Sequence, residues 1–238
     1  MRANENKILE ALSYATLSGD KRPISAYTEK ELAEITFLYL TGVSGDLSLL
    51  LSFPNLEQLD ISDSTDIDLK SISALDRLSA LTLHGAGYTS GTLSSLTHLE
   101  SLSISLNEGA QLPAKELSQL PHLHELCVRS AGTLDFSFLD GCKALNSLWA
   151  FDCGKVENIP SLIKRKLHYF NCDRGVLKQL IKVRAHGVNS ILNQISTHDI
   201  RPTQAHADAF ELERLIFMAA GQIAKSELQF EGDTEMPF

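Results

Sequence analysis

The sequence lacks long apolar runs and is poor in cysteine and tryptophan. No uninterrupted apolar stretch reaches the roughly 18 residues that a membrane-spanning helix needs, so we expect no membrane span. Residues 1–17 place Glu5, Lys7 and Glu10 among the apolar positions, which is unlike a secretory signal. Only four cysteines occur in 238 residues, and we expect all of them to be reduced thiols of a cytoplasmic protein.

The common catalytic motifs are absent as well. The chain has no G-x-x-x-x-G-K-[ST], no G-x-S-x-G and no G-x-G-x-x-G, and no histidine has zinc-ligand spacing with a cysteine or glutamate. Asp60-Ile61-Ser62-Asp63-Ser64 matches the D-x-S-x-S spacing of a divalent-cation site. However, Ile61 also belongs to an apolar pattern that recurs along the chain, and that pattern already accounts for it. We therefore expect no catalytic residue, no metal site and no cofactor.

The charge is negative and unevenly spread. The chain has 30 acidic and 21 basic residues, for a net charge of −9, which argues against general nucleic-acid binding. Residues 46–76 are acidic, with Lys70 as their one basic residue, and residues 164–184 are basic, with Asp173 as their one acidic residue. Both segments fit solvated surfaces or partner sites, and the basic one leaves nucleic-acid binding open as a weaker alternative.

One apolar pattern recurs five times, and its first leucines are 22, 21, 24 and 22 residues apart. A fixed period of this size predicts a solenoid of stacked coils. Less regular copies begin at Ile35 and Leu167. The five regular copies are Leu56-x-x-Leu59-x-Ile61, Leu78-x-x-Leu81-x-Leu83, Leu99-x-x-Leu102-x-Ile104, Leu123-x-x-Leu126-x-Val128 and Leu145-x-x-Leu148-x-Ala150.

Each copy predicts a short strand followed by a short helical return. In Leu81-Thr82-Leu83 the leucines alternate with a polar residue, so they point to one side of a strand. Stacking the copies gives a parallel sheet over a continuous leucine core. Before each strand, apolar residues recur every three positions, as in Ile72, Leu75 and Leu78. That spacing favours 3₁₀ or single-turn helices on the opposite, convex side.

From Ile35 to Cys172 the chain resembles leucine-rich repeat proteins of the roughly 22-residue class, such as the bacterial internalins. The resemblance implies an α/β horseshoe with its parallel sheet on the concave face. It also implies an asparagine three residues after the last strand leucine, bonded to the backbone of adjacent coils. Only Asn107 matches well, and Cys153 is an accepted substitute, so we expect some distorted coils. The seven equivalent residues are Val43, Ser64, Ala86, Asn107, Ala131, Cys153 and Gly175.

The pattern divides the chain into four segments. Residues 1–34 predict a helical N-terminal cap, with Asn4 capping its first helix and Thr28 to Glu31 forming a capping box. Residues 35–175 hold about seven coils. Residues 176–228 predict a helical C-terminal cap whose last helix either closes the solenoid or forms a homodimer face, so the protein is a monomer or a homodimer. Residues 229–238 read as a flexible acidic tail.

The outward strand positions are the candidate binding site, because aromatic and arginine side chains anchor many protein interfaces. The C-terminal helices could instead cover the aromatic residues among them. We predict a non-catalytic protein-binding module and, within that class, an inhibitor of the bacterial immunity type acting on a basic toxin or enzyme through its concave face. An adaptor or a host-directed effector is the alternative. The candidate residues are Tyr39, Asp60, His84, Glu125, Arg129, Trp149, Phe151, Tyr169 and Asp173.

Overall fold

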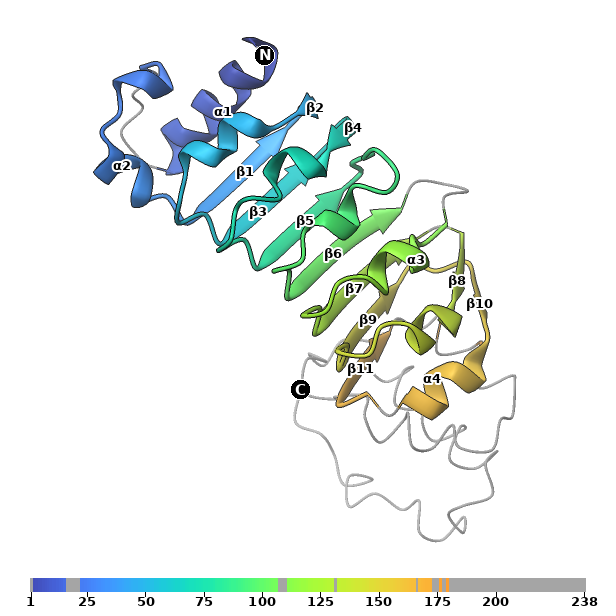
Figure 1. The fold of residues 1–238 in the computed structure, drawn as a ribbon. Coiled ribbons are helices and arrows are strands. Elements are labelled where there is room, and N and C mark those ends of the chain that lie inside the picture. Colours follow the sequence, from blue (N-terminus) through green and yellow to red (C-terminus); the bar gives the residue numbers. More distant parts are fainter. Residues whose placement is uncertain are drawn as a thin grey trace, which may run out of the picture.

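A computed structural model describes residues 2–15, 22–106, 111–130, 132–165 and 167–172, together with Val176 and Gln179. The array is elongated, with successive strands side by side and the N-terminal helix at one end (Figure 1). Seven parallel strands form its main sheet in the order β1-β3-β5-β6-β7-β9-β11. Their bounds are β1 Phe37–Thr41, β3 Gln58–Ser62, β5 Ala80–His84, β6 Ser101–Leu106, β7 Glu125–Ser130, β9 Ser147–Phe151 and β11 Tyr169–Cys172.

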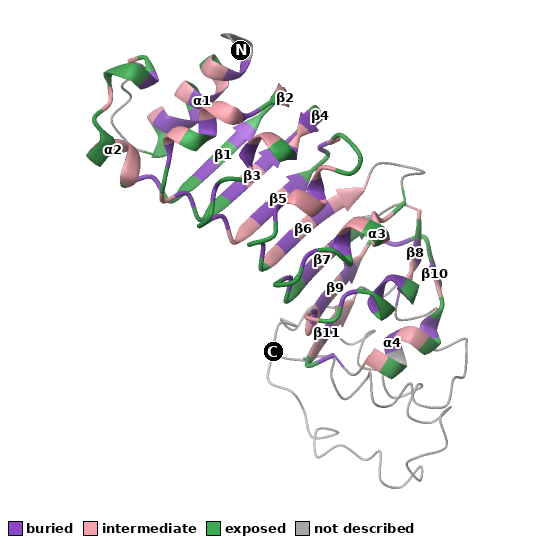
Figure 2. Ribbon diagram, viewed as in Figure 1, coloured by how far each residue is buried: buried purple, intermediate pink, exposed green. Residues whose placement is uncertain are grey.

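The predicted repeat sets the register of this sheet. Leu38 pairs with Leu59, Leu59 with Leu81, and Leu81 with Leu102, and the same alignment continues through Leu126 and Leu148. Buried residues alternate with exposed or half-buried ones along these strands (Figure 2). The inward set forms the continuous leucine core of a leucine-rich repeat solenoid, as the spacing predicted.

A repeated backbone contact joins each coil to the next. The Thr36 carbonyl accepts hydrogen bonds from both Glu57 N and Gln58 N, at 2.8 and 3.0 Å. The Glu57 carbonyl does the same for Ser79 and Ala80. The same contact recurs from each main strand to the next, with one carbonyl accepting two backbone N–H groups. These bonds satisfy the backbone donors at the point where each following strand begins.

Short helices cover the side of the sheet that holds the core, as the stride of three predicted. Four are 3₁₀ segments and two are short α-helices. Ile72 and Leu78 from the stride are buried beneath them. The covering elements are η2 Ser48–Ser52, η3 Leu69–Ile72, η4 Leu93–Ser95, α3 Ala114–Leu117, η5 Phe136–Asp140 and α4 Ile159–Arg165.

Two further short sheets follow the main strands, and the sequence did not predict them. β2 (Ser44–Asp46) pairs with β4 (Thr65–Asp68), and β8 (Thr133–Asp135) pairs with β10 (Lys155–Glu157). The main sheet keeps one register, whereas the β2–β4 pair shifts between Ser44 and Gly45. The expected irregularity is therefore found in these outer segments.

The N-terminal residues form α1 (Arg2–Ala15), η1 (Ile24–Ala26) and α2 (Glu29–Ala33). The predicted capping box is confirmed, because Thr28 Oγ1 accepts from Glu31 N and the Glu31 carboxylate accepts from Thr28 N. The Thr28 backbone hydrogen bond, followed by Arg22, lowers the pKa of Glu31 to about 2.

The prediction that Asn4 caps the first helix is wrong. Asn4 lies inside α1 and is buried. Its Nδ2 donates to the carbonyls of Ser44 and Asp46, at 2.6 and 2.8 Å, and its Oδ1 accepts from Ser44 N at 3.2 Å. The side chain thus pairs with the outer edge of β2, because an exposed strand edge needs partners for its backbone groups.

Beyond Cys172 the structure describes only Val176 and Gln179. Val176 is fully buried in the core. Gln179 Oε1 accepts from Val156 N at 2.8 Å, and its Nε2 donates to the Gly154 carbonyl at 3.2 Å. The rest of the predicted C-terminal cap and the predicted tail lie outside the described residues.

Candidate functional site

The outward residues of the seven strands form one surface, which we call the strand face. Its central column runs through register partners on successive strands, and one column flanks it on each side. These columns are those that the repeat predicted. The central column is Tyr39, Asp60, Thr82, Ser103, Cys127, Trp149 and Asn171.

Aromatic residues gather at the C-terminal end of the strand face, and we call Arg129, Trp149, Phe151 and Tyr169 the aromatic cluster. The ring centroids of Trp149 and Tyr169 are 5.0 Å apart with a 45° tilt. The Arg129 guanidinium lies 4.8 Å from the Phe151 ring centroid, and its Nη1 is 3.5 Å from Asp152 Oδ2. Asn171 Nδ2 donates to the Tyr169 hydroxyl at 3.3 Å. The four predicted residues thus lie on the adjacent strands β7, β9 and β11 as two contacting pairs, Trp149 with Tyr169 and Arg129 with Phe151.

A second aromatic group lies on β1 at the other end, and we call Phe37 and Tyr39 the N-terminal pair. They are 43% and 53% exposed. The Tyr39 hydroxyl lies 2.7 Å from Ser62 Oγ, which fixes the ring over the neighbouring strand. The candidate set omitted Phe37, although the alternation of β1 could have found it, since Phe37 and Tyr39 flank the buried Leu38.

Small side chains separate the two aromatic groups, so the strand face is not one continuous apolar patch. β5 and β6 present Ala80, Thr82, Ser101 and Ser103, all half-buried. Cys127, a free thiol on β7, continues this floor. The candidates therefore divide between two ends, with a low polar surface between them.

The other candidates occupy separate places on this surface. Asp60 is half-buried on β3, where Gln58 Nε2 donates to its Oδ1 at 3.4 Å. His84, exposed at the end of β5, has its Nδ1 3.1 Å from Ser105 Oγ. Glu125 is exposed at the start of β7. Asp173 lies outside the described residues.

Several acidic residues of segment 46–76 have local structural roles. Asp46 Oδ1 accepts from Ser48 N at 2.7 Å, and Asp68 Oδ1 accepts from Lys70 N at 3.0 Å. Asp135 accepts likewise from Ser137 N, at 2.8 Å. Asp68 and Asp135 are the N-caps of η3 and η5, whereas Asp46 lies one position before Leu47, the N-cap of η2, and bonds the first residue of that segment. The hydrogen bond from Ser48 N lowers the pKa of Asp46.

The D-x-S-x-S segment is also explained by packing. Ser62 and Ser64 are both buried. Ser64 Oγ accepts from Val43 N at 3.0 Å and donates to the Ser62 carbonyl at 2.7 Å. Ser64 therefore occupies the ladder position that the resemblance assigns to asparagine. Within the described residues, no group of three or more His, Cys, Asp or Glu side chains could share a metal ion.

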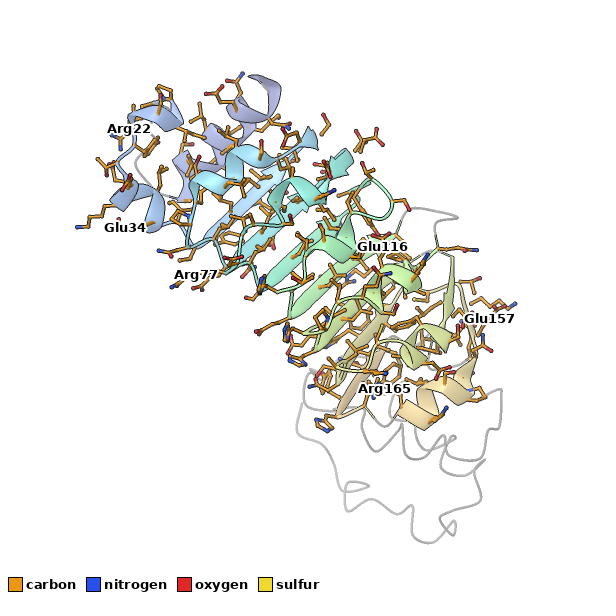
Figure 3. The ribbon with its side chains drawn as sticks, in the orientation of Figure 1. Arg22, Glu34, Arg77, Glu116, Glu157 and Arg165 are labelled. Carbon is orange, nitrogen blue, oxygen red and sulfur yellow. The ribbon has the colours of Figure 1, made fainter. Side chains whose placement is uncertain are left out.

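A hollow of about 730 Å³ lies on the helical side, lined by η4, α3 and Tyr88. Glu116, on α3, has its carboxylate engaged by Leu93 N at 2.9 Å (Figure 3). Burial, with Glu116 nearby, raises the pKa of Tyr88 above its ordinary value.

Of the basic segment 164–184, the structure describes residues 164–165 and 167–172 together with Val176 and Gln179, and Arg165 has a structural role. Its Nη2 donates to the carbonyls of Cys142 and Leu145, at 3.0 and 2.8 Å, and to that of Lys143 (Figure 3). Cys142 is buried, and burial raises its thiol pKa to about 11, so the thiol stays protonated. A guanidinium held on backbone carbonyls is poorly placed to bind phosphate.

In the part of the chain that the structure describes, none of the helices has the length and apolar character needed to span a bilayer. Comparison with protein-family models finds no match, and comparison with curated proteins finds none either. Among solved structures the chain is similar to internalin C2 of Listeria monocytogenes, with 19% identity and a TM-score of 0.49 over 71% of this chain and 84% of that one. It is also similar to internalin InlF of the same organism, with 21% identity and a TM-score of 0.49 over 71% of this chain and 56% of that one.

Proposed function

We propose that this protein is a non-catalytic binding module that holds a partner protein on its strand face. The observation that supports this most directly is the aromatic cluster, in which Trp149, Phe151 and Tyr169 are held together with Arg129 on three adjacent strands. Aromatic and arginine side chains bury a large area at a low cost in side-chain entropy, and they are common interface anchors.

The same proposal extends to an inhibitor of the immunity type, whose partner is a basic toxin or enzyme. A net charge of −9 favours fast association with a basic surface. Asp63 and Asp66 are exposed beside the strand ends. An adaptor or effector that binds without inhibiting would use the same surface. We place the protein in the cytoplasm, and we propose that the segments before β1 and after β11 act as caps of the array.

Affinity capture from a lysate of the native cells tests the binding surface. The double variant Trp149→Ala, Phe151→Ala should lose a stoichiometric partner that the wild type retains. Tyr14→Ala is the matched control, because Tyr14 is a 74% exposed aromatic on α1 and not on the strand face. Retention of the partner by the double variant would place the contact elsewhere.

The charge hypothesis needs a separate variant. Asp63 and Asp66 have φ angles of 47° and 52°, a left-handed conformation that asparagine tolerates. Asp63→Asn combined with Asp66→Asn therefore removes two charges without new backbone strain. We expect association with the captured partner to slow several-fold and to depend less on salt. An unchanged association rate would argue against steering by these residues, and an activity assay of the captured partner would separate inhibitor from adaptor.

A further inference from the structure

We infer that the partner presents a basic amphipathic α-helix, laid across the strands between the N-terminal pair and the aromatic cluster. This inference rests on the proposed function and specifies what the strand face holds. It is carried by the spacing of the two aromatic groups, the shape of the floor between them, the state of the sheet backbone and the charge of the face.

The spacing of the two aromatic groups matches a helix of moderate length. Tyr39 on β1 and Trp149 on β9 occupy the same column and are separated by five strand intervals. At about 4.8 Å per interval the separation is about 24 Å. A helix rises 1.5 Å per residue, so about 16 residues would span from one group to the other.

The floor between the groups leaves room for the body of a helix. Ala80, Thr82, Ser101 and Ser103 are all small, whereas the residues at both ends are large aromatics. A five-residue strand such as β5 is about 17 Å long, wider than the 10–12 Å diameter of a helix with its side chains. The helix would rest on the small residues and insert an apolar side chain at each end.

The sheet backbone favours an occupant whose own backbone is already satisfied. Interior strands such as β5 and β6 are paired on both sides, so their N–H and C=O groups are used within the sheet. An extended peptide on this face would find side chains but no backbone partners. A helix satisfies its backbone groups internally, and therefore loses least on being buried there.

The charge of the face selects a basic helix. The outward columns and the residues just before each strand carry the carboxylates of Glu57, Asp60, Glu100 and Glu125. Among these described positions Arg129 is the one Lys or Arg, and it is already paired with Asp152. Lysine or arginine on the flanks of the helix would meet this acidic surface.

Both ends are positioned before binding. The hydrogen bond between Tyr39 and Ser62 fixes the first ring, and that from Asn171 helps to fix Tyr169 against Trp149. Preorganised anchors lose little conformational entropy when a partner binds.

The test uses two display libraries on a rigid, tryptophan-free helical scaffold. One presents an 18-residue helix and the other a 9-residue helix, each with arginine on its flanks and randomised apolar positions, and a loop library is selected in parallel. Trp149 is the only tryptophan of the chain, so its fluorescence reports contact with the aromatic cluster. The rate at which Cys127 is alkylated reports whether a bound helix covers the small residues between the two aromatic groups.

Long-helix binders should change the Trp149 emission, protect Cys127 and weaken about tenfold or more with either Tyr39→Ala or Trp149→Phe. Short-helix binders should respond to one of these substitutions only. Tyr14→Ala should leave the affinity of both kinds of binder unchanged. Thermal melting of every variant checks that it folds. Long-helix binders insensitive to Tyr39→Ala, loop binders alone, or no binders at all would each overturn the inference.

These outcomes separate the inference from the function beneath it. If a captured partner still depends on Trp149 and Phe151 while the helix libraries fail, the strand face binds a partner of another shape. If capture does not depend on these residues, the proposed binding surface itself is wrong.

Discussion

The first and last repeats share one backbone plan but satisfy their polar groups differently. At the N-terminal end Asn4 forms three hydrogen bonds with the outer edge of β2, and Ser64 bonds two coils at the ladder position. At the C-terminal end Gln179 Oε1 accepts from Val156 N of β10 and its Nε2 donates to the Gly154 carbonyl, and the Cys153 thiol at the ladder position lies 3.3 Å from the Phe151 carbonyl.

This difference shows which positions of a repeat require one kind of residue and which accept several. The inward strand residues from β1 to β9 are leucine, isoleucine, valine or alanine, and those of β11 are Phe170 and Cys172, because the coils share one apolar core. A polar position, in contrast, requires only a side chain of any type that can hydrogen-bond with the nearby backbone. The fold therefore keeps its inward leucines while the ladder position accepts residues other than asparagine.

Core truncations should have the largest effect and should be alike in the two halves. Leu59→Ala on β3 and Leu148→Ala on β9 each remove a fully buried side chain. We expect each to lower the free energy of unfolding by about 2–5 kcal/mol, through lost burial and the cavity that remains. Urea denaturation followed by circular dichroism measures both. A cost below about 1 kcal/mol in one half alone would show that its core is not continuous with the other.

Truncation of the Asn4 and Gln179 side chains should have different costs in stability, which distinguishes the two ends of the array. Asn4→Ala leaves three backbone groups of β2 without their partner, and Asn4 is buried, so we expect a loss of about 1–3 kcal/mol. Gln179→Ala removes the hydrogen bonds to Val156 N and to the Gly154 carbonyl at a half-buried site, with a loss of about 0.5–1.5 kcal/mol. Hydrogen exchange should show the Ser44 amide exposed in the first variant and the Val156 amide in the second. The reverse order of costs would contradict this view of the two edges.

Substitution at the ladder position should also cost more stability in the N-terminal half than in the C-terminal half. Ser64→Ala leaves the buried Val43 amide without its acceptor, and we expect a loss of about 1–2 kcal/mol. Cys153→Ala removes a thiol, which is weak both as a hydrogen-bond donor and as an acceptor, and should cost about 1 kcal/mol or less. Thermal melting compares the two, with Ser64→Cys as a control that restores volume but gives a poorer acceptor. Equal costs for Ser64→Ala and Cys153→Ala would show that volume, and not hydrogen bonding, sets the value of this position.

The repeat predicted the main sheet because a period-two alternation inside a 22-residue period leaves one choice of inward residues. It therefore placed Trp149, Phe151 and Tyr169 together correctly. It did not predict the β2–β4 and β8–β10 pairs, since segments such as Ser44-Gly45-Asp46 have no apolar alternation. It also misassigned Asn4, because a helix-capping residue and an edge-pairing residue look the same until the neighbouring strand is placed.

The smallest effect concerns the acid dependence of stability at Asp46 and Asp135. A hydrogen bond from Asn158, at 2.7 Å, and one from Ser137 N lower the pKa of Asp135, and the Ser48 amide lowers that of Asp46. Because the folded pKa lies below the unfolded value of about 3.9, each carboxylate contributes stability above that pH and loses it as the pH falls further. Asp135→Asn or Asp46→Asn should therefore reduce the loss of stability between pH 7 and pH 3.

Asn158→Gly provides the matched control for the C-terminal carboxylate. Its φ of 53° suits glycine, so the substitution removes the amide donor and keeps the backbone conformation. Asp135 would retain the Ser137 donor, and its pKa should rise only part of the way towards the ordinary value. The acid dependence of Asn158→Gly should then fall between those of the wild type and Asp135→Asn. Identical curves for the wild type and Asn158→Gly would show that the backbone amide alone sets this pKa, which would make Asp46 and Asp135 equivalent in this respect.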